Sequence, residues 1–206
     1  MKRIRTPREV LAALDRALAA KAGPVKAGSP LEKAVEILYD QRRYFWVGIY
    51  LVAGERLERQ VFRGPVPPCR SFALGQGNVG TAGQTGLIKV ISDVSQDPTY
   101  SMCFLETKSE IVVPIKICGR VLGVIDVESD RADAFGPLDR ILLKNVATRL
   151  ARFLTSTGKR YVRKAKEAAA EAEATAPAER GHPPASEKPA AAPVPRRAAA
   201  GDQARP

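Results

Sequence analysis

Cysteine and histidine, two residue types that often serve as nucleophile, general base or metal ligand, are both scarce in this chain. The single histidine, His182, lies in a stretch rich in alanine and proline near the C-terminus. A folded domain without histidine cannot present a histidine-ligated haem or zinc, nor a Ser-His or Cys-His catalytic pair. The three cysteines, Cys69, Cys103 and Cys118, show no CxxC spacing, which argues against a zinc knuckle. We therefore expect no metal ion and no cofactor.

Three acidic residues fall in segments that alternate in the manner of β-strands. Alternation places Asp126 and Glu128 on one face of a strand, whereas Ile125 and Val127 point to the other face. Glu110 alternates in the same way with its apolar neighbours. These carboxylates either line a binding site from the inside or form the exposed polar face of a sheet.

Two aromatic residues stand in a continuous apolar run at residues 45–52. Trp46 and Tyr50 belong to the run FWVGIYLV, whose β-branched and aromatic residues predict a strand. Their side chains either pack the core behind this strand or line a ligand site. The sequence leaves both alternatives open.

The elements that must position these side chains begin and end with helices. Thr6-Pro7-Arg8-Glu9 and Ser29-Pro30-Leu31-Glu32 each combine a hydroxyl N-cap, proline at the first helical position and glutamate three residues after the cap. An apolar face between residues 138 and 154 predicts a strong helix near the end of the domain.

Strands and loops fill the space between these helices. In chain order we predict a hairpin at 45–62, a short strand at 71–74, a glycine-rich helix at 77–86, a strand at 87–92, a long loop at 93–107 and a final hairpin at 110–129. A loop of that length in a compact domain is usually functional. This order predicts an α+β domain with a mostly antiparallel sheet, not a doubly wound fold.

Composition bounds the organisation of the 206 residues. The net charge of +11 is spread along the chain without a long like-charged run, so nucleic-acid binding is not expected. No apolar run reaches the length of a membrane span and the start lacks a signal-peptide stretch, so we expect a soluble, cytoplasmic protein with no membrane contact. We predict four parts: an N-terminal helical lead at 1–29, one domain at 30–156, a polar helical extension at 157–176 and a disordered, Ala/Pro-rich basic tail at 177–206.

Four sequence blocks in order resemble the GAF family, which is related to PAS domains. The blocks are GQGNVGTAGQTG, DVSQDPTY, SEIVVPI and GVIDVES. The resemblance implies a sheet with helices packed on one face and ligand-pocket loops on the other, and a role in binding a small molecule. The first block also spells the dinucleotide pattern GxGxxG, but no βαβ unit surrounds it, so we interpret these glycines as backbone turns.

The cysteine positions resemble more narrowly the free methionine-(R)-sulfoxide reductases, GAF proteins that reduce oxidised free methionine with thiols. Cys69 stands six residues before the first glycine of GQG, and Cys103 stands ten residues after the aspartate of DVSQDPTY, as in that family. The chain departs from the family pattern at Val79, where the family has a third cysteine, at Phe104, where it has an acid, and at Glu128, where it has an aspartate. The histidines that the family has in the loop beginning with the block DVSQDPTY are also replaced in this chain.

The resemblance implies a role for each of these residues. Cys103 would attack the sulfoxide, Cys69 would resolve the resulting sulfenic acid as a disulfide, and a thioredoxin-like partner would reduce that disulfide. Cys118 has no counterpart in the pattern and is interpreted as structural. The residues implied to bind the ligand, with acids holding its ammonium group, are Glu110, Asp126, Glu128, Trp46 and Tyr50.

Two other classes of function fit the same sequence. The first is a non-catalytic sensor module in signal transduction, which binds an unknown small ligand and uses its terminal helices to form a homodimer. The second is a nucleic-acid-associated protein that uses the basic tail. Close approach of the two cysteines favours the reductase, whereas rigid separation of their Cα atoms well beyond about 7 Å favours the sensor.

Overall fold

A computed structural model describes residues 6–19, 28–42 and 44–157. The predicted tail at 177–206, which contains His182, lies outside the described residues, as does the predicted extension beyond Thr157. Within the described ranges, no helix is both long enough and apolar enough to cross a membrane.

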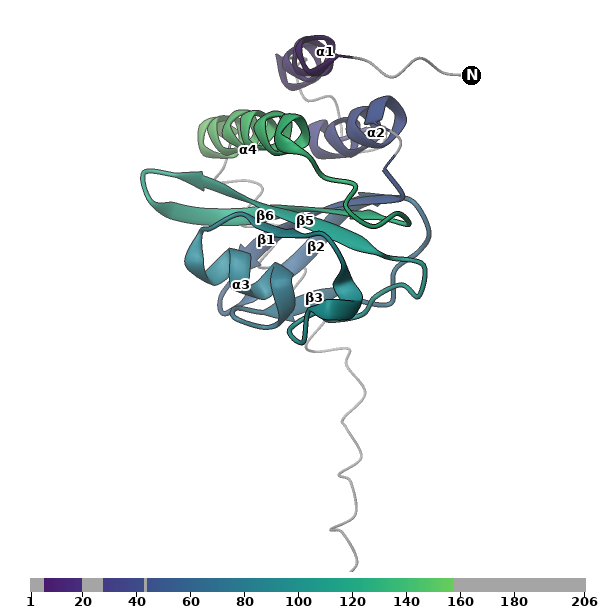
Figure 1. Cartoon of the computed structure of the whole chain (residues 1–206). Helices are drawn as coiled ribbons and strands as arrows, with labels where there is room; N and C mark the ends of the chain where they lie inside the picture. The colour runs from purple at the N-terminus through teal and green to yellow at the C-terminus, as the bar shows by residue number, and fades with distance from the viewer. Residues whose placement is uncertain (1–5, 20–27, 43, 158–206) are drawn as a thin grey trace, which may run out of the picture. The chain divides into compact units, whose positions relative to one another are not determined.

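One six-stranded antiparallel sheet forms the centre of the domain, and this confirms the predicted α+β class (Figure 1). The spatial order is β3-β2-β1-β6-β5-β4, so the first and last hairpins of the sequence meet side by side in the middle. The strands are β1 (Trp46–Ala53), β2 (Arg56–Arg63), β3 (Ser71–Ala73), β4 (Lys89–Ile91), β5 (Ser109–Ile117) and β6 (Arg120–Ser129).

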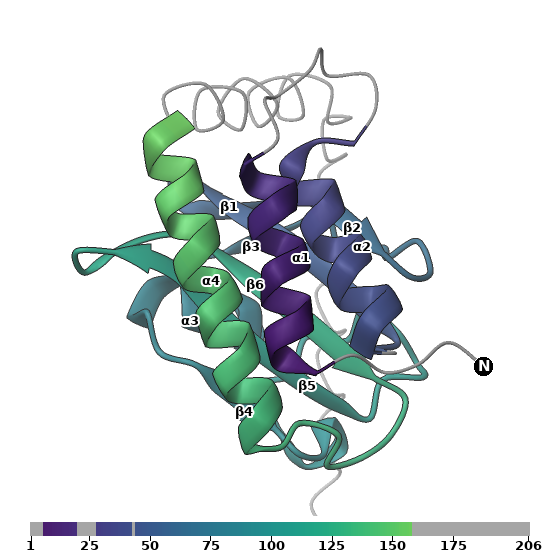
Figure 2. The same ribbon diagram turned by 90° about the horizontal axis from the view of Figure 1, so that it is seen from above.

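Three helices lie on one face of this sheet and one short helix lies on the other (Figure 1). The helices of the first face are α1 (Pro7–Ala19), α2 (Pro30–Arg42) and α4 (Pro137–Thr157). Seen from above, α2 and α4 run over the sheet and α1 lies on both of them (Figure 2). The opposite face carries α3 (Gly77–Thr85), together with the 3-10 turn η1 (Val94–Gln96) in the long loop.

The first two helices begin where the sequence predicts. Thr6 and Glu9 form a capping box, in which the Glu9 N–H donates to Thr6 Oγ1 at 3.3 Å and the Thr6 N–H donates to Glu9 Oε2 at 2.8 Å. Ser29 and Glu32 make the same pair of bonds, at 3.2 and 2.7 Å. Each box satisfies N–H groups that a helix start otherwise leaves without a partner.

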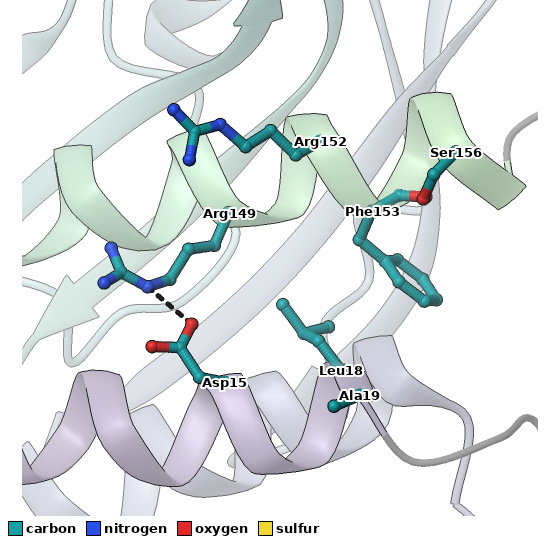
Figure 3. A pocket seen from close by; sticks show the side chains of 7 residues that line it. All are labelled: Asp15, Leu18, Ala19, Arg149, Arg152, Phe153 and Ser156. Carbon is teal, nitrogen blue, oxygen red and sulfur yellow. Dashed lines mark hydrogen bonds and ion pairs between the residues drawn. The ribbon is translucent and has the colours of Figure 1, made fainter.

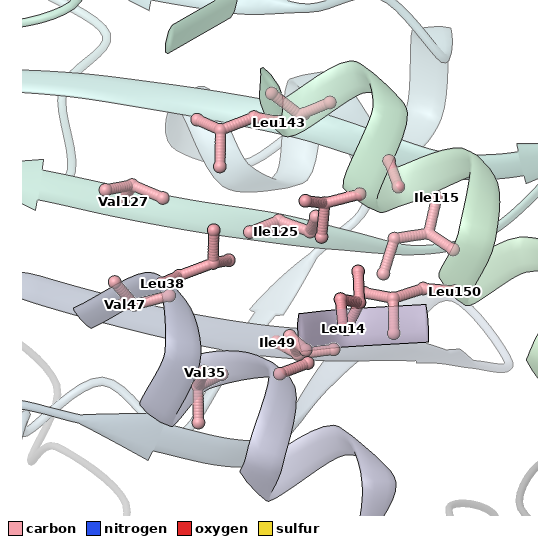
Figure 4. Close-up of a cluster of buried hydrophobic side chains, with 14 of the residues drawn as sticks. Leu14, Val35, Leu38, Val47, Ile49, Ile115, Ile125, Val127, Leu143 and Leu150 are labelled. Atoms are coloured by element: carbon pink, nitrogen blue, oxygen red, sulfur yellow. The ribbon is translucent and has the colours of Figure 1, made fainter. Parts of the chain in front are cut away.

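The larger apolar core fills the space between the sheet and the three helices (Figure 4). Alternate residues of the central strands point into it, among them Ile49 of β1, Ile115 of β5 and Ile125 of β6. Helix α4 contributes Leu143 and Leu150, which are fully buried. The buried side chains of this cluster are apolar, and their removal from water stabilises the fold.

The opposite face holds a smaller cluster, rich in aromatic side chains, in which glycine allows close packing. The indole of Trp46 lies over Gly48, where an added Cβ would meet Trp46 Cη2 at 2.0 Å. Helix α3 approaches β3 so closely that a Cβ on Gly80 would lie 2.1 Å from the carbonyl oxygen of Ala73. Glycines at these positions therefore bring α3 and the indole down onto the sheet.

We predict that Gly48→Ala lowers the free energy of unfolding by about 1–3 kcal/mol, because the new methyl group must displace a packed indole. The matched control is Gly136→Ala, since nothing lies within 4 Å of the Cβ it would add. That control should change stability by less than about 1 kcal/mol. Urea unfolding followed by circular dichroism measures both, and equal stability of the two variants would contradict this account of the Trp46 contact.

Candidate functional site

The three predicted acidic residues lie together on the aromatic face of the sheet. Glu110 of β5 pairs directly with Glu128 of β6, and Asp126 lies two residues along β6, opposite Val112. Strand β1 continues the row, because Trp46 pairs with Glu128. The predicted alternation is therefore correct: the acids share one face, and their apolar neighbours point into the helical core.

All three carboxylates are almost completely removed from solvent. The exposed fraction is 3% for Glu110 and 2% for both Asp126 and Glu128. The alternative of an exposed polar sheet face is thereby ruled out for these residues. Burying charged groups costs free energy unless they are hydrogen-bonded or neutralised, so the surroundings of the cluster must supply partners.

Partners for two of the acids come from α3 and from the long loop between β4 and β5. Asn78 near the start of α3 donates through Nδ2 to Glu110 Oε2 at 2.9 Å and to Asp97 Oδ2 at 2.8 Å. Thr107 Oγ1 donates to Glu128 Oε2, and the Tyr100 hydroxyl lies 3.5 Å from the same oxygen. These bonds tie the loop to the carboxylates on both sides of the cluster.

Burial raises the pKa of each acid in the cluster. Burial, followed by the charge of Glu128, raises the pKa of Glu110 to about 8, although the hydrogen bond from Asn78 opposes the shift. Burial raises the pKa of Glu128 to about 7 against the hydrogen bond from Thr107. The pKa of Asp126 rises well above its ordinary value through burial and through the charges of the two glutamates. The cluster therefore holds protons near neutral pH.

An aromatic wall stands beside the acids. Trp46 lies in contact with three other rings, at centroid distances of 6.3 Å to Tyr50, 6.2 Å to Phe62 and 5.8 Å to Phe104. Trp46 and Tyr50 are therefore both packed and close to the carboxylates, so the two alternatives stated for them are compatible. Phe104 is buried, so an apolar ring occupies the position where the reductase pattern has an acid.

Two buried polar atoms of this region have no hydrogen-bond partner among the described residues. They are Trp46 Nε1, a donor, and Asp126 Oδ1, an oxygen that can accept. Buried polar atoms in native proteins are almost always paired, so each unpaired one calls for an explanation. A ligand with its own donor and acceptor groups could satisfy both.

The two predicted cysteines are joined in a disulfide on the same side of the sheet. Cys69 lies before β3 and Cys103 lies in the long loop, 34 residues later, with their Cα atoms 5.7 Å apart. Both cysteines pack against the aromatic cluster. Cys118 is exposed and free at the turn between β5 and β6. The chain thus brings together a cysteine pair, an aromatic wall and a buried acidic cluster.

Several residues of this site could not be identified from sequence patterns alone. Asn78 stands inside a glycine-rich block, and Thr107 ends a long polar loop. Neither position stands out by residue type or period. Their partners Glu110 and Glu128 lie 32 and 21 residues away in the sequence, so the hydrogen bonds leave no local pattern. Across the described ranges, no group of three His, Cys, Asp or Glu side chains has an arrangement that could hold a metal ion.

A separate hollow of about 540 Å³ lies on the helical side of the sheet, between α1 and α4 (Figure 3). The Arg149 guanidinium pairs with Asp15 across it, with Nε and Oδ1 2.7 Å apart. Leu18 and Phe153 supply its apolar lining. None of the residues predicted to act in chemistry or binding contributes to this hollow.

Comparison with known proteins identifies the family. The sequence profile described as GAF domain matches residues 29–154. GAF domain-containing protein A of Dictyostelium discoideum is 36% identical over 117 residues, which are 56% of this chain and 73% of that protein. The free methionine-R-sulfoxide reductase of Saccharomyces cerevisiae is 35% identical over 106 residues, which are 50% of this chain and 58% of that protein.

Among solved structures, the fold is similar to free methionine-R-sulfoxide reductase from Neisseria meningitidis in complex with its substrate. The TM-score is 0.66 and the identity 30%, covering 79% of this chain and 91% of that one. The fold, the profile match and these relatives agree with one another. This chain belongs to the GAF domain family and is homologous to free methionine-R-sulfoxide reductases.

Proposed function

We propose that this protein is a thiol-dependent reductase of free methionine-(R)-sulfoxide, or of a related small sulfoxide that carries an ammonium group. The observation that carries the proposal is the Cys69–Cys103 disulfide, which packs against the aromatic cluster on the acidic face of the sheet. A disulfide at this place is the product expected of one turnover. Similarity to the Neisseria meningitidis reductase, solved with its substrate, supports the same substrate class.

The reaction needs two thiols acting in order. The Cys103 thiolate attacks the sulfoxide sulfur and, with proton uptake, the oxygen passes to Cys103, which leaves methionine and a sulfenic acid. The Cys69 thiolate then attacks the sulfenic sulfur, the S–S bond forms, and the S–O bond breaks to release hydroxide, which takes a proton to become water. An external dithiol returns the disulfide to two thiols.

Placement of the two cysteines supports this division of roles. Cys103 lies in the loop whose Tyr100 and Thr107 contact Glu128, so it stands in the segment that covers the acidic cluster. Phe104, directly after it, packs on Trp46. A thiol in this segment is the one that a ligand on the acidic face would meet.

The acidic cluster is the proposed site for the ammonium group of the substrate. A cation entering it would pair with carboxylates that otherwise retain protons, and Asp126 Oδ1 is available to accept a hydrogen bond. Trp46 Nε1 could donate to the sulfoxide or carboxylate oxygen. Tyr50, which neighbours Trp46, would complete the wall of the site.

The reductant we propose is a thioredoxin-like dithiol protein. Small dithiol proteins exchange with accessible disulfides, and the Cys69–Cys103 pair is only half-buried. Such a cycle requires a reducing compartment, so we propose a cytoplasmic location.

A second candidate function is a non-catalytic ligand-binding module in signal transduction. Two observations favour it: Val79 and Phe104 are buried apolar residues at positions where the reductase pattern has a cysteine and an acid. A sensor would use the same acidic face for its ligand. Leu138 and Ile141 are exposed on α4, and they could serve a homodimer built on the helical face.

The cysteine roles give the first test of the reductase. With free methionine-(R)-sulfoxide, thioredoxin, thioredoxin reductase and NADPH, we expect turnover by the wild type and none by Cys103→Ser. Cys69→Ser should release about one equivalent of methionine and then stop at the sulfenic acid, because the resolving thiol is gone.

Cys118→Ser is the matched control, since Cys118 is exposed and free at the hairpin turn. It should keep nearly full activity. Mass spectrometry of sulfoxide-treated protein should find the Cys69–Cys103 disulfide, and recovery of a Cys103–Cys118 bridge alone would refute the assignment. Absence of turnover by folded, reduced wild type would leave the ligand-binding module as the function.

The buried acids give a second test, which needs no substrate. Their pKa values lie above those of an unfolded chain, so the folded state holds extra protons between about pH 4.5 and 8. The free energy of unfolding should therefore be highest below this window and fall as pH rises through it. The slope should be on the order of 1 kcal/mol per pH unit for each proton released.

In Glu110→Gln, the free energy of unfolding should fall less steeply as pH rises, because glutamine can still accept a hydrogen bond from Asn78 but does not ionise. Glu106→Gln, which changes an exposed carboxylate in the neighbouring loop, is the control and should keep the wild-type slope. Urea unfolding at pH 5, 6, 7 and 8 measures all three proteins. A wild-type stability that rises across this range would show that the cluster is already ionised.

A further inference from the structure

Arg59 connects β2 to the segment that carries Cys69. Its Nη1 donates to the carbonyl oxygen of Cys69 at 2.8 Å and to that of Pro67 at 3.1 Å. Its backbone N–H donates to the carbonyl oxygen of Arg70 at 3.0 Å. One residue thus holds residues 67–70 by three hydrogen bonds, and one of the acceptors belongs to the cysteine itself.

The guanidinium of Arg59 also lies against an aromatic ring, which restricts its position. Its Cζ lies 4.8 Å from the centroid of the Phe62 ring, a distance typical of a cation–π contact. Phe62 in turn stacks on Trp46 with an interplanar angle of 17°. A continuous stack of side chains therefore runs from the aromatic wall of the site to the backbone of Cys69.

Arg59 differs in this from the other two arginines of its strand. Arg56 pairs with Glu58, and Arg63 pairs with Glu36. Arg59 instead gives its hydrogen bonds to backbone carbonyls on the site's side of the sheet. Its charge also reaches the aromatic cluster, because it opposes the rise that burial causes in the pKa of Tyr50.

We propose that Arg59 is a positioning residue for the second thiol, which holds the backbone of Cys69 where its sulfur can reach Cys103. The proposal deepens the proposed function and rests on its assignment of these cysteines as a redox pair. In the step concerned, Cys69 sulfur attacks the sulfenic sulfur of Cys103, the S–S bond forms and hydroxide leaves. Formation of this bond requires that the loops carrying Cys69 and Cys103 each hold a fixed conformation. Arg59 fixes the conformation of the loop that carries Cys69.

The chemistry of arginine explains why this residue type suits the task. A planar guanidinium can serve two carbonyl acceptors in fixed directions while its face lies on an aromatic ring. A lysine at this position keeps the charge, but its ammonium is a point donor on a flexible stem. Lysine should therefore restore the function only in part.

The test is the equilibrium between the reduced and disulfide forms of the Cys69–Cys103 pair. We would incubate Cys118→Ser protein with mixtures of reduced and oxidised dithiothreitol, trap free thiols by alkylation and count them by mass spectrometry. In this background, Arg59→Met should lower the equilibrium constant for disulfide formation by about tenfold, because two charge-assisted hydrogen bonds to the loop are lost. Arg59→Lys should fall between Arg59→Met and the parent.

Arg70→Met is the matched control. It removes a positive charge next to Cys69, but the structure gives the exposed Arg70 side chain no hydrogen bond to this loop. Its equilibrium constant should stay within about twofold of the parent. An Arg59→Met value equal to that of Arg70→Met in folded protein would overturn the proposal. If Arg59→Met does not fold, a parent-like value for Arg59→Lys would overturn it instead.

A second measurement follows the step itself. In a single turnover with methionine-(R)-sulfoxide, Arg59→Met should release methionine at the parent rate but form the disulfide about tenfold more slowly. The dithiothreitol equilibrium needs no sulfoxide, so absence of turnover in the parent protein would remove the proposed function without altering that result. Equal slowing of both steps would contradict a role confined to Cys69.

Discussion

Burial of three neighbouring carboxylates is the constraint on which the rest of this site depends. Placing Glu110, Asp126 and Glu128 side by side away from water is costly, and the protein meets the cost with hydrogen bonds and retained protons. Hydrogen bonds to the two glutamates come from Asn78 of α3 and from Thr107 of the long loop. The carboxylates therefore hold α3 and the long loop against one face of the sheet through these hydrogen bonds.

That arrangement links the proposed ligand site to the two cysteines. The loop that caps Glu128 through Thr107 also contains Cys103, and the disulfide joins this loop to the segment before β3. The larger apolar core lies on the other face of the sheet, beneath the three helices. The aromatic face differs from that core in holding buried polar atoms that have no hydrogen-bond partner among the described residues.

Sequence patterns predicted the fold and the faces of its strands for a clear physical reason. Hydrophobic alternation directly reports which side of a strand meets the core, so the placement of Glu110 and Asp126 follows from their neighbours. The capping boxes at Thr6 and Ser29 are equally local, because all their partners lie within three residues. The pairing of Cys69 with Cys103 is not local, and only resemblance to a known family suggested it.

The unpredicted residues are those whose roles depend on distant partners. Asn78 is remote in sequence from Glu110, and its bond forms only once glycines let α3 settle against β3. Arg59 looks like one of several charges on a polar strand until the loop after β2 folds back over it. Such roles arise from tertiary contacts and leave no periodic signal in the chain.

The cross-link between Cys69 and Cys103 closes a segment of 34 residues and so ties redox state to resistance against unfolding. In the chain-entropy account, a loop of this length disfavours the unfolded chain by about 3–4 kcal/mol. Every passage from the dithiol to the disulfide would then make the molecule harder to unfold, and every reduction would loosen it again. Where proteolysis proceeds through the unfolded chain, the disulfide form should therefore be cleaved more slowly than the dithiol form.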